Sequence, residues 1–445
     1  MKIVIIGAVA AGTSAAAKAR RNAPDAQITV YERDTDISYV GCGLPYYIGG
    51  LVTDRAQLAP RDNAFFKRKY GVDVLTRHEV LSMDRANKMV TIKNLESGKV
   101  FEDSYDKLVT ATGASPFVPE IPGIDQKHVF VLRNVQNAVA IREYIERHRP
   151  KNAVIIGSGN IGLEMLENLP GIDVSVVEAA PQIATAFDAD MAEMLESTLR
   201  ERGVRFYTSR RVERISQTGV TMNGGETLDA ELVIVAAGVR PNVGLAQQAG
   251  LKLGAKGSIW VDKQMRTSDA NIYACGDCAE TFSAITGQPA WYPLGSTANK
   301  TGRIAGDALT GGSLEYHGSL GTGVFKVMDM AAGMTGLSER GARAAGYDVA
   351  TVRHQNVDKF EEFGGKPLTI KAVADRKTRR LLGAQVIGYG GVDTRLDVYA
   401  AMITKKATVD ELEDLDLAYA PPFATARDPV HYTGMLLVSA LDRRG

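Results

Sequence analysis

Cysteine is scarce in this chain, since only three of its 445 residues, Cys42, Cys275 and Cys278, are of this type. Three cysteines are too few for the disulfide framework of a small secreted fold. Their scarcity fits a reducing compartment, and we expect the protein to be cytoplasmic. In such a compartment, a cysteine in an unusual setting is either buried packing or a centre of chemistry.

Charge of one sign and long apolar runs are missing as well. Lys plus Arg and Asp plus Glu are balanced at 52 each, which gives no overall reason to expect nucleic acid or an anionic membrane as a partner. No stretch approaches the roughly 20 apolar residues of a membrane-spanning helix. The length of 445 residues predicts two or three domains. Low-complexity and Pro-rich tracts are absent too, so we expect these domains to pack tightly against one another.

One pattern is present twice: a short β-branched run, a Gly-rich turn, a helix-prone segment and a second strand that ends in an acid. The turns are residues 7–12 and 157–162, and the acids are Glu32 and Glu178. Small residues let the backbone approach a pyrophosphate, helix N-terminal amides bind its charge, and the acid accepts a hydrogen bond from a ribose hydroxyl. The pattern predicts two Rossmann-like dinucleotide-binding units. Only the second turn has the full G-x-G-x-x-G spacing, because Val9 replaces the middle glycine of the first.

Three further segments complete the organisation. Residues 108–113 and 233–238 are apolar strands that end in Ala-x-Gly, and we interpret them as points where the chain crosses between domains. Residues 271–277 form a strand that ends in Gly-Asp, which can present a carboxylate to a chain of hydroxyls. Beyond about residue 320 the sequence lacks a nucleotide turn and mixes strand-like and helical patterns, which indicates a separate α+β domain.

With these motifs the chain resembles the pyridine nucleotide-disulfide oxidoreductases from end to end. The resemblance implies an α/β fold with an FAD-binding domain (1–112 and 249–318), an NAD(P)H-binding domain (113–248) and a dimerisation domain (319–445). An isologous homodimer is expected. The positions that match the family's cofactor contacts are Gly7, Ala10, Ala11, Gly12, Glu32, Arg33, Ser38, Ala111, Thr112, Gly113, Gly157, Gly159, Asn160, Ile161, Gly162, Glu178, Gly238, Gly276, Asp277 and Thr297.

The segment around Cys42 resembles one part of this family. It lacks the second cysteine of a C-x4-C pair, as in CoA disulfide reductases, CoA persulfide or polysulfide reductases, NADH oxidases and NADH peroxidases. Oxidases and peroxidases carry a histidine in the first Gly-rich turn, where this chain has Ala10, and no histidine precedes His78. That turn and residues 418–423 are similar instead to the CoA disulfide reductases.

The resemblance to that subgroup implies a reaction in which NAD(P)H, through FAD, reduces a mixed disulfide between Cys42 and coenzyme A. Tyr419 of the partner subunit is the implied proton donor. We expect a helix over residues 44–48 whose N-terminal amides lower the pKa of the Cys42 thiol. The implied CoA contacts, four of them basic as the CoA phosphates require, are Ser14, Lys18, Arg21, Ser38, Lys69, Asn299 and Arg427.

Two alternatives follow from the same sequence: an NADH oxidase or peroxidase that uses a Cys42 sulfenic acid, and a ferredoxin-reductase-like electron-transfer flavoprotein in which Cys42 is dispensable. Glu178 favours NADH because it repels a 2'-phosphate, although members of the family use both nucleotides. Asn160 stands where relatives often carry an aromatic residue over the flavin, and residues 360–363 replace a second tyrosine. Cys275 and Cys278 are expected to be structural, and no metal site is predicted.

Overall fold

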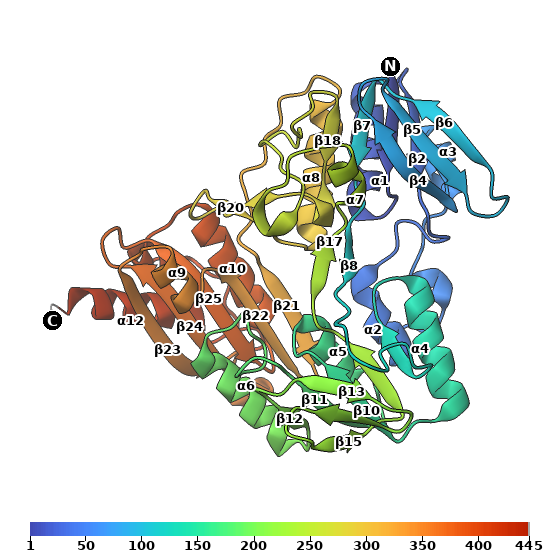
Figure 1. Ribbon diagram of the computed structural model, residues 1–445. Coiled ribbons are helices and arrows are strands. Elements are labelled where there is room, and N and C mark those ends of the chain that lie inside the picture. Colours follow the sequence, from blue (N-terminus) through green and yellow to red (C-terminus); the bar gives the residue numbers. More distant parts are fainter. Residues whose placement is uncertain (444–445) are drawn as a thin grey trace.

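The computed structural model describes residues 1–443, which form three layered units around a central gap between ribbons (Figure 1). The N-terminal unit is built on a parallel five-stranded sheet in the order β18-β7-β1-β2-β3. Its strands are nearly continuous apolar runs, as expected for a parallel sheet covered on both faces. Their bounds are β1 Lys2–Ile6, β2 Gln27–Tyr31, β3 Asp73–Leu75, β7 Lys107–Thr110 and β18 Ile272–Ala274.

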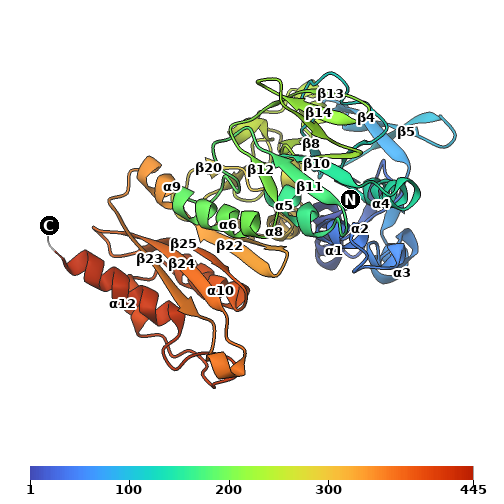
Figure 2. The ribbon, with the colours of Figure 1, turned by 90° about the horizontal axis from the view of Figure 1, so that it is seen from below.

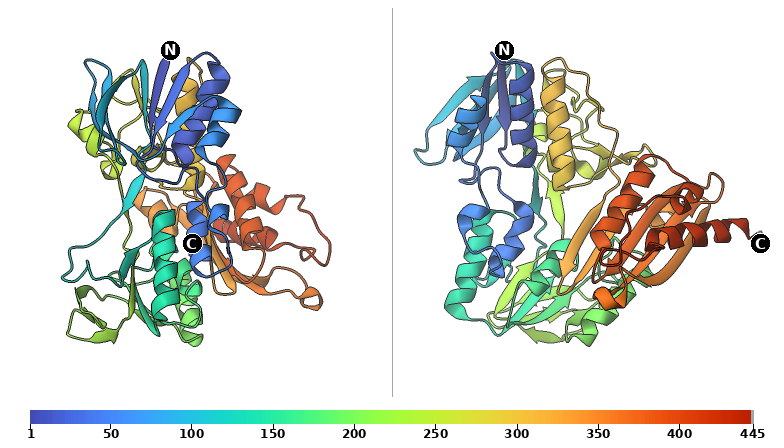
Figure 3. Two further views of the ribbon diagram at one scale, coloured as in Figure 1. Left: turned by 90° about the vertical axis from the view of Figure 1, so that its right-hand side faces the viewer. Right: turned by 180° about the vertical axis from the view of Figure 1, so that it is seen from behind.

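Helices and a small antiparallel sheet cover this parallel sheet. The elements are α1 Ala10–Asn22, α3 Asn63–Tyr70, α7 Gly244–Gln248, α8 Gly295–Ala308, β4 His78–Asp84, β5 Met89–Asn94 and β6 Val100–Ser104. In the right-hand view of Figure 3, α1 (dark blue) and α8 (yellow) lie side by side. They approach closely because Gly302 and Gly306 of α8 face the backbone of Ala11 and Ala15 of α1, where a Cβ atom would overlap.

The second unit repeats the same design. Its five-stranded parallel sheet has the order β12-β11-β10-β16-β9. Its elements are β9 Val129–Val131, α4 Val135–His148, β10 Asn152–Ile156, α5 Asn160–Glu167, β11 Asp173–Val177, α6 Ala189–Glu201, β12 Arg205–Tyr207, β13 Val212–Ile215, β14 Gly219–Met222, β15 Thr227–Asp229 and β16 Leu232–Val235. The chain enters and leaves through the antiparallel pair β8 (Ala114–Pro116) and β17 (Val239–Pro241), at the two crossing points predicted from the Ala-x-Gly segments.

One short helix packs in a different unit from its neighbours in the sequence. Helix α2 (Leu44–Ile48) follows β2 of the first sheet, yet Leu44, Tyr47 and Ile48 are buried in the core of the second unit, together with Leu163 of α5. Its apolar side chains find their partners on α4 and α5. Cys42, immediately before this helix, therefore lies where the two nucleotide-binding units meet.

The third unit is an antiparallel sheet in the order β21-β22-β25-β24-β23, with helices on its outer side. Figure 2 shows α12 along the outer side of this sheet and α6 on the side toward the second unit. The elements of this unit are β21 Gly323–Val327, β22 Met330–Gly336, α9 Glu339–Ala344, β23 Val349–Val357, β24 Pro367–Asp375, β25 Leu381–Gly388, α10 Val392–Thr404, α11 Val409–Glu413 and α12 Pro429–Asp442. A separate antiparallel pair, β19 Thr281–Phe282 and β20 Pro289–Ala290, precedes it in the chain.

The predicted fold class, two Rossmann-like units followed by an α+β domain, is confirmed by these sheets. The strand and helix positions agree with the sequence patterns to within a few residues. No helix in residues 1–443 is both long and apolar enough to cross a membrane.

Candidate active site

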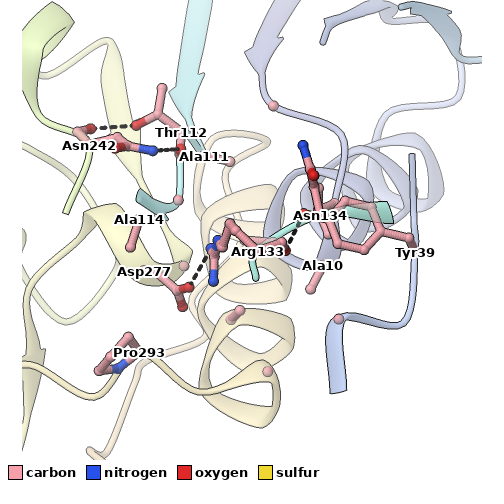
Figure 4. Close-up of a pocket in the computed structure, with 18 of the residues that line it drawn as sticks. Ala10, Tyr39, Ala111, Thr112, Ala114, Arg133, Asn134, Asn242, Asp277 and Pro293 are labelled. Carbon is pink, nitrogen blue, oxygen red and sulfur yellow. Dashed lines mark hydrogen bonds and ion pairs between the residues drawn. The ribbon is translucent and has the colours of Figure 1, made fainter. Parts of the chain in front are cut away.

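A cavity of about 1550 Å³ joins the two nucleotide-binding units (Figure 4). Its walls include the first Gly-rich turn, Cys42, Asp277 and the start of α5 at Asn160. Residues that lie far apart in the sequence therefore share one space. Figure 4 shows Ala10, Thr112, Arg133 and Asp277 around it.

The first Gly-rich turn is shaped to receive a phosphate group. Gly7 adopts a left-handed φ of +102°, and a Cβ there would overlap the carbonyl of Ala111. A Cβ at Gly12 would overlap the carbonyl of Gly7. Glu32, which is buried, accepts hydrogen bonds from the N–H of Ala8 at 2.7 Å and of Asp34 at 2.9 Å, and burial raises its pKa. This small-residue cradle with an adjoining acid fits an adenine dinucleotide.

The Gly-Asp segment completes that half of the cavity. Asp277 follows β18, and its carboxylate pairs with Arg133 at 3.0 Å, as Figure 4 shows. Gly276 has a φ of +75°, and a Cβ there would overlap the Cβ of Ala11. The absence of a side chain therefore lets this turn lie close to α1. The carboxylate can accept hydrogen bonds from the hydroxyls of a ribityl chain.

The second Gly-rich turn repeats the construction of the first. Gly157 has a φ of +104°, and a Cβ there would overlap the carbonyl of Ala236. Glu178 accepts hydrogen bonds from the N–H of Ser158 at 2.9 Å and of Ala180 at 2.8 Å. Asn160 is exposed at the first position of α5 and lines the cavity. The arrangement fits a second dinucleotide.

Cys42 is solvent-exposed and lies in a single turn of 3₁₀ helix, Gly41–Gly43. The expected helix over 44–48 forms, but the expected lowering of the thiol pKa is wrong for this chain. Although the residue is exposed, the walls of the cavity partly desolvate its sulfur, and this effect and the nearby carboxylate of Glu164 raise the pKa of Cys42. A helix of only five residues provides too few aligned peptides to outweigh these two effects.

Glu164 is a site residue that the motif analysis did not identify. It lines the cavity on α5, one turn beyond Asn160, and burial together with the charge of Glu167 raises its pKa to about 7. The sequence could have indicated Glu164, because it follows Asn160 by four residues and residues i and i+4 share one face of a helix.

Cys275 and Cys278 lie beneath the Gly-Asp turn and are fully buried. The Cys278 thiol donates to the carbonyl of Thr110 at 3.4 Å and of Cys275 at 3.3 Å. Among residues 1–443 there is no group of three His, Cys, Asp or Glu side chains suited to hold a metal ion.

Five of the seven predicted CoA contacts line the cavity, and the other two, Lys69 and Arg427, lie outside its lining. Ser14, Lys18, Arg21, Ser38 and Asn299 line the cavity, and Ser14 donates to Asn299 at 2.9 Å across the α1–α8 contact. Lys18 is already paired with an acid, Asp307, at 3.0 Å.

Other cavity-lining residues in this region were not predicted. Arg61 and Arg303 are exposed cations of the wall, and Phe65 and Tyr70 give it two aromatic rings. Arg303 follows Asn299 by four residues on α8 and therefore shares its helix face. Lys69 contacts the rings of Phe65 and Tyr70 from outside the lining. No local motif marks Arg61, which precedes α3 in a loop.

Tyr419 and Arg427 lie in the C-terminal domain, outside the lining of the same chain's cavity. Half of the surface of Tyr419 is exposed, and so is 78% of Phe423. Arg427 lies over the ring of Tyr432 at 5.6 Å. These residues are accessible to a second subunit.

The family comparison agrees with this geometry. Residues 1–301 match the pyridine nucleotide-disulphide oxidoreductase model, and residues 323–430 match the dimerisation domain of the same group. The chain belongs to the pyridine nucleotide-disulphide oxidoreductase family, and the resemblance inferred from its motifs is confirmed.

Individual members of this family are similar to the chain over nearly its whole length. The chain is 39% identical over 442 residues to an NAD(P)H coenzyme A polysulfide/persulfide reductase of Pyrococcus horikoshii, covering 96% of each protein. It is 31% identical to a coenzyme A disulfide reductase of Staphylococcus haemolyticus, covering 97% of this chain and 98% of that one. An NAD-dependent persulfide reductase from A. fulgidus superposes with a TM-score of 0.96 at 41% identity, over 100% of this chain and 84% of that one. An NADH oxidase of Methanocaldococcus jannaschii is 35% identical, with 97% of each covered.

Proposed function

We propose that this protein is an FAD-dependent NAD(P)H reductase of CoA disulfide or CoA persulfide, which acts through a mixed disulfide between Cys42 and CoA. The observation that carries the proposal is the cavity itself. It joins two dinucleotide turns, one exposed cysteine and a wall of cations and aromatic rings. A phosphate-rich thiol ligand can bind the cations while its sulfur reaches Cys42.

The two Gly-rich turns and their acids would hold FAD and NAD(P)H. FAD, when bound, supplies a relay that carries two electrons from the nicotinamide to sulfur. Glu178 supports a preference for NADH, since its carboxylate occupies the position that a 2'-phosphate would approach.

The chain's own residues perform the sulfur chemistry. The Cys42 thiolate attacks one sulfur of CoA disulfide, the Cys42–S–CoA bond forms, and the other CoA leaves as a thiolate. With CoA persulfide, attack at the CoA-bound sulfur releases hydrosulfide instead. The mixed disulfide then takes up two electrons and one proton, which releases CoA and restores the Cys42 thiolate. Tyr419 of the partner subunit is the proposed proton donor to the leaving thiolate, and a homodimer is supported by the dimerisation-domain match.

An NADH oxidase is the second candidate, favoured by the name of the Methanocaldococcus relative. The first turn argues against it. Ala10 lines the cavity there, so this turn supplies no acid or base for a sulfenic acid cycle.

Substitution of Cys42 by serine tests the proposal. We expect Cys42→Ser to lose CoA-disulfide and CoA-persulfide reduction while it keeps bound flavin, because the cysteine forms the bond but not the nucleotide cradle. The intact mass of the non-reduced wild type should include a thiol-reversible adduct of CoA mass, and peptide mapping should place it on Cys42. An oxygen adduct without CoA, or a Cys42→Ser enzyme that still reduces disulfides, would refute the proposal.

A further inference from the structure

Two surface loops of the C-terminal domain carry exposed aromatic side chains. The short loop, residues 358–366, holds Phe360 and Phe363, and the long loop, residues 415–428, holds Tyr419 and Phe423. Apart from a single 3₁₀ turn, Glu361–Phe363, both loops lie outside the regular elements of the sheet and its helices. These four aromatic side chains are between 37% and 78% exposed, so the positions of the loops depend strongly on how their ends are fixed.

A single guanidinium joins the two loops. Arg395 of α10 is 5% exposed. Its Nη2 donates to the carbonyl of Asp358 at 2.7 Å and to Oδ2 of Asp428 at 2.7 Å, and its Nε donates to the same carboxylate at 3.2 Å. The first residue of the short loop and the last residue of the long loop are thus held by one planar group.

The surroundings of Arg395 are built to accommodate this junction. Gly391 has a φ of +62°, and a Cβ there would overlap Nη1 of Arg395. Asp428 also caps α12 by accepting from the N–H of Val430 at 2.9 Å. Asp358 closes the short loop, since its carboxylate accepts from the N–H of Lys366 at 2.6 Å.

The other end of the long loop has an anchor of its own. Nε2 of His431 lies 2.7 Å from the carbonyl of Leu415, so Nε2 carries the proton that is donated there. The long loop is therefore fixed at its first residue by His431 and at its last by Arg395, with Tyr419 exposed between them.

We propose that Arg395 is a positioning residue that sets both loops for contact with the partner subunit, and thereby places Tyr419 at the partner's cavity. This inference rests on the proposed function, in which Tyr419 acts across the dimer. An arginine suits the task because its rigid fork binds two acceptors in one plane, whereas lysine offers a single flexible ammonium. A buried ion pair adds little net stability over apolar packing, and it can instead fix geometry.

The test is Arg395→Lys in the flavin-loaded enzyme, with two electron acceptors. Ferricyanide takes electrons from the flavin and does not need Tyr419, whereas CoA disulfide needs the whole site. We expect FAD content, dimer mass and NADH–ferricyanide turnover within about twofold of wild type. We expect kcat with CoA disulfide to fall by about tenfold or more, because small displacements of a catalytic group are costly. KM for NADH should not change.

Arg379→Lys is the matched control. Arg379 also joins two acids of this domain, Asp410 at 2.6 Å and Asp442 at 2.8 Å, but at the opposite end of α12. It should leave both turnovers unchanged. Tyr419→Phe should lower the CoA-disulfide rate in the wild type and have much less effect in Arg395→Lys.

Two results would overturn the inference: full CoA-disulfide turnover in Arg395→Lys, or an equal loss with both acceptors. If this variant loses its flavin or its dimer, Asp428→Asn repeats the test with the guanidinium intact, and the same selective loss is expected. A wild type that reduces ferricyanide but neither CoA disulfide nor CoA persulfide would instead overturn the proposed function, and this inference with it.

Discussion

At the scale of single residues, the environment of Cys42 differs from the expectation that its sequence motif raised. The Gly-Cys-Gly-Leu-Pro segment predicts an activated thiol at the start of a helix. In the folded chain Cys42 is exposed, but the cavity walls partly desolvate its sulfur and the charge of Glu164 acts on it, and both effects raise its pKa. A bound ligand or the loss of the negative charge on Glu164 would therefore be needed to lower the pKa of the Cys42 thiol.

Glu164→Gln should make the Cys42 thiolate form at a lower pH. With a pKa of about 7, Glu164 carries its negative charge mainly above pH 7 and is largely neutral below it. Removal of this charge favours the thiolate, so the variant should alkylate faster with iodoacetamide above pH 7 and approach the wild-type rate at lower pH. Glu167→Gln is the comparison, since Glu167 is paired with Lys326 at 3.3 Å and should have a smaller effect. Equal rates for Glu164→Gln and wild type at pH 8 would contradict the prediction.

Arg61 and Arg303 should contribute to binding of the CoA phosphates. The double variant Arg61→Gln/Arg303→Gln removes two cations from the cavity wall, and charge-assisted bonds to phosphate are stronger than neutral ones. We expect KM for CoA disulfide to rise by about tenfold or more, with a weaker salt dependence and an unchanged KM for NADH. Steady-state kinetics at two ionic strengths measure both effects. A parallel rise of KM for NADH would indicate general damage rather than a phosphate contact.

At the scale of elements, the close contact between α1 and α8 holds the first Gly-rich turn against the Gly-Asp segment. Gly302 has no space for a side chain, because a Cβ would overlap the backbone of Ala11. Gly302→Val should lower the free energy of unfolding by about 1–3 kcal/mol, as overpacking does in well-packed cores. Loss of FAD should accompany it, since Ala11 belongs to the phosphate turn.

The control for this contact lies on the same helix. Gly295 of α8 has no heavy atom within 4 Å of its Cβ position. Gly295→Ala should change the free energy of unfolding by less than about 1 kcal/mol. Urea unfolding with flavin fluorescence separates the two variants, and equal destabilisation would show that the α1–α8 spacing is not the cause.

At the scale of the whole molecule, a buried ionic cluster joins the second unit to the C-terminal domain. Lys371 of β24 is 6% exposed. Its Nζ lies 3.4 Å from Asp188, 2.8 Å from Asp190 and 2.9 Å from Glu339. Glu339 also pairs with Arg343 at 2.8 Å, but Lys371→Ala leaves the buried carboxylate of Asp188 without a cation and should cost about 3–5 kcal/mol of unfolding free energy.

A second ion pair across the same two units gives the comparison. Lys326 is itself 58% exposed, although its partner Glu167 is only 9% exposed, so Lys326→Ala should cost less unfolding free energy than Lys371→Ala. Calorimetry of both variants measures the difference. If Lys371→Ala were as stable as Lys326→Ala, the cluster would not couple the two units.

The cluster also makes stability depend on pH. Burial acts to raise the pKa of Asp188, but hydrogen bonds from the N–H groups of Glu339 and Arg340 lower it on balance. Hydrogen bonds from Arg343 and Lys371 lower the pKa of Glu339. A lowered pKa contributes stability that is present above the unfolded values, 3.8 for Asp and 4.5 for Glu, and is lost as the pH falls through the folded pKa. The advantage of wild type over Lys371→Ala should therefore shrink below about pH 4.

The sequence by itself determined the two βαβ units, the acids that follow them and the family, because these depend on local order: strand, small-residue turn, helix, acid. The predicted positions of β1, β10 and the crossing strands agree with the structure for that reason. Only the tertiary structure decided that α2 packs into the second core, that Glu164 shares the cavity with Cys42, that Lys18 is paired with Asp307, and that Arg395 joins two loops. Each of these depends on contacts between residues distant in sequence, and burial and charge at such contacts have no local pattern from which they could be predicted.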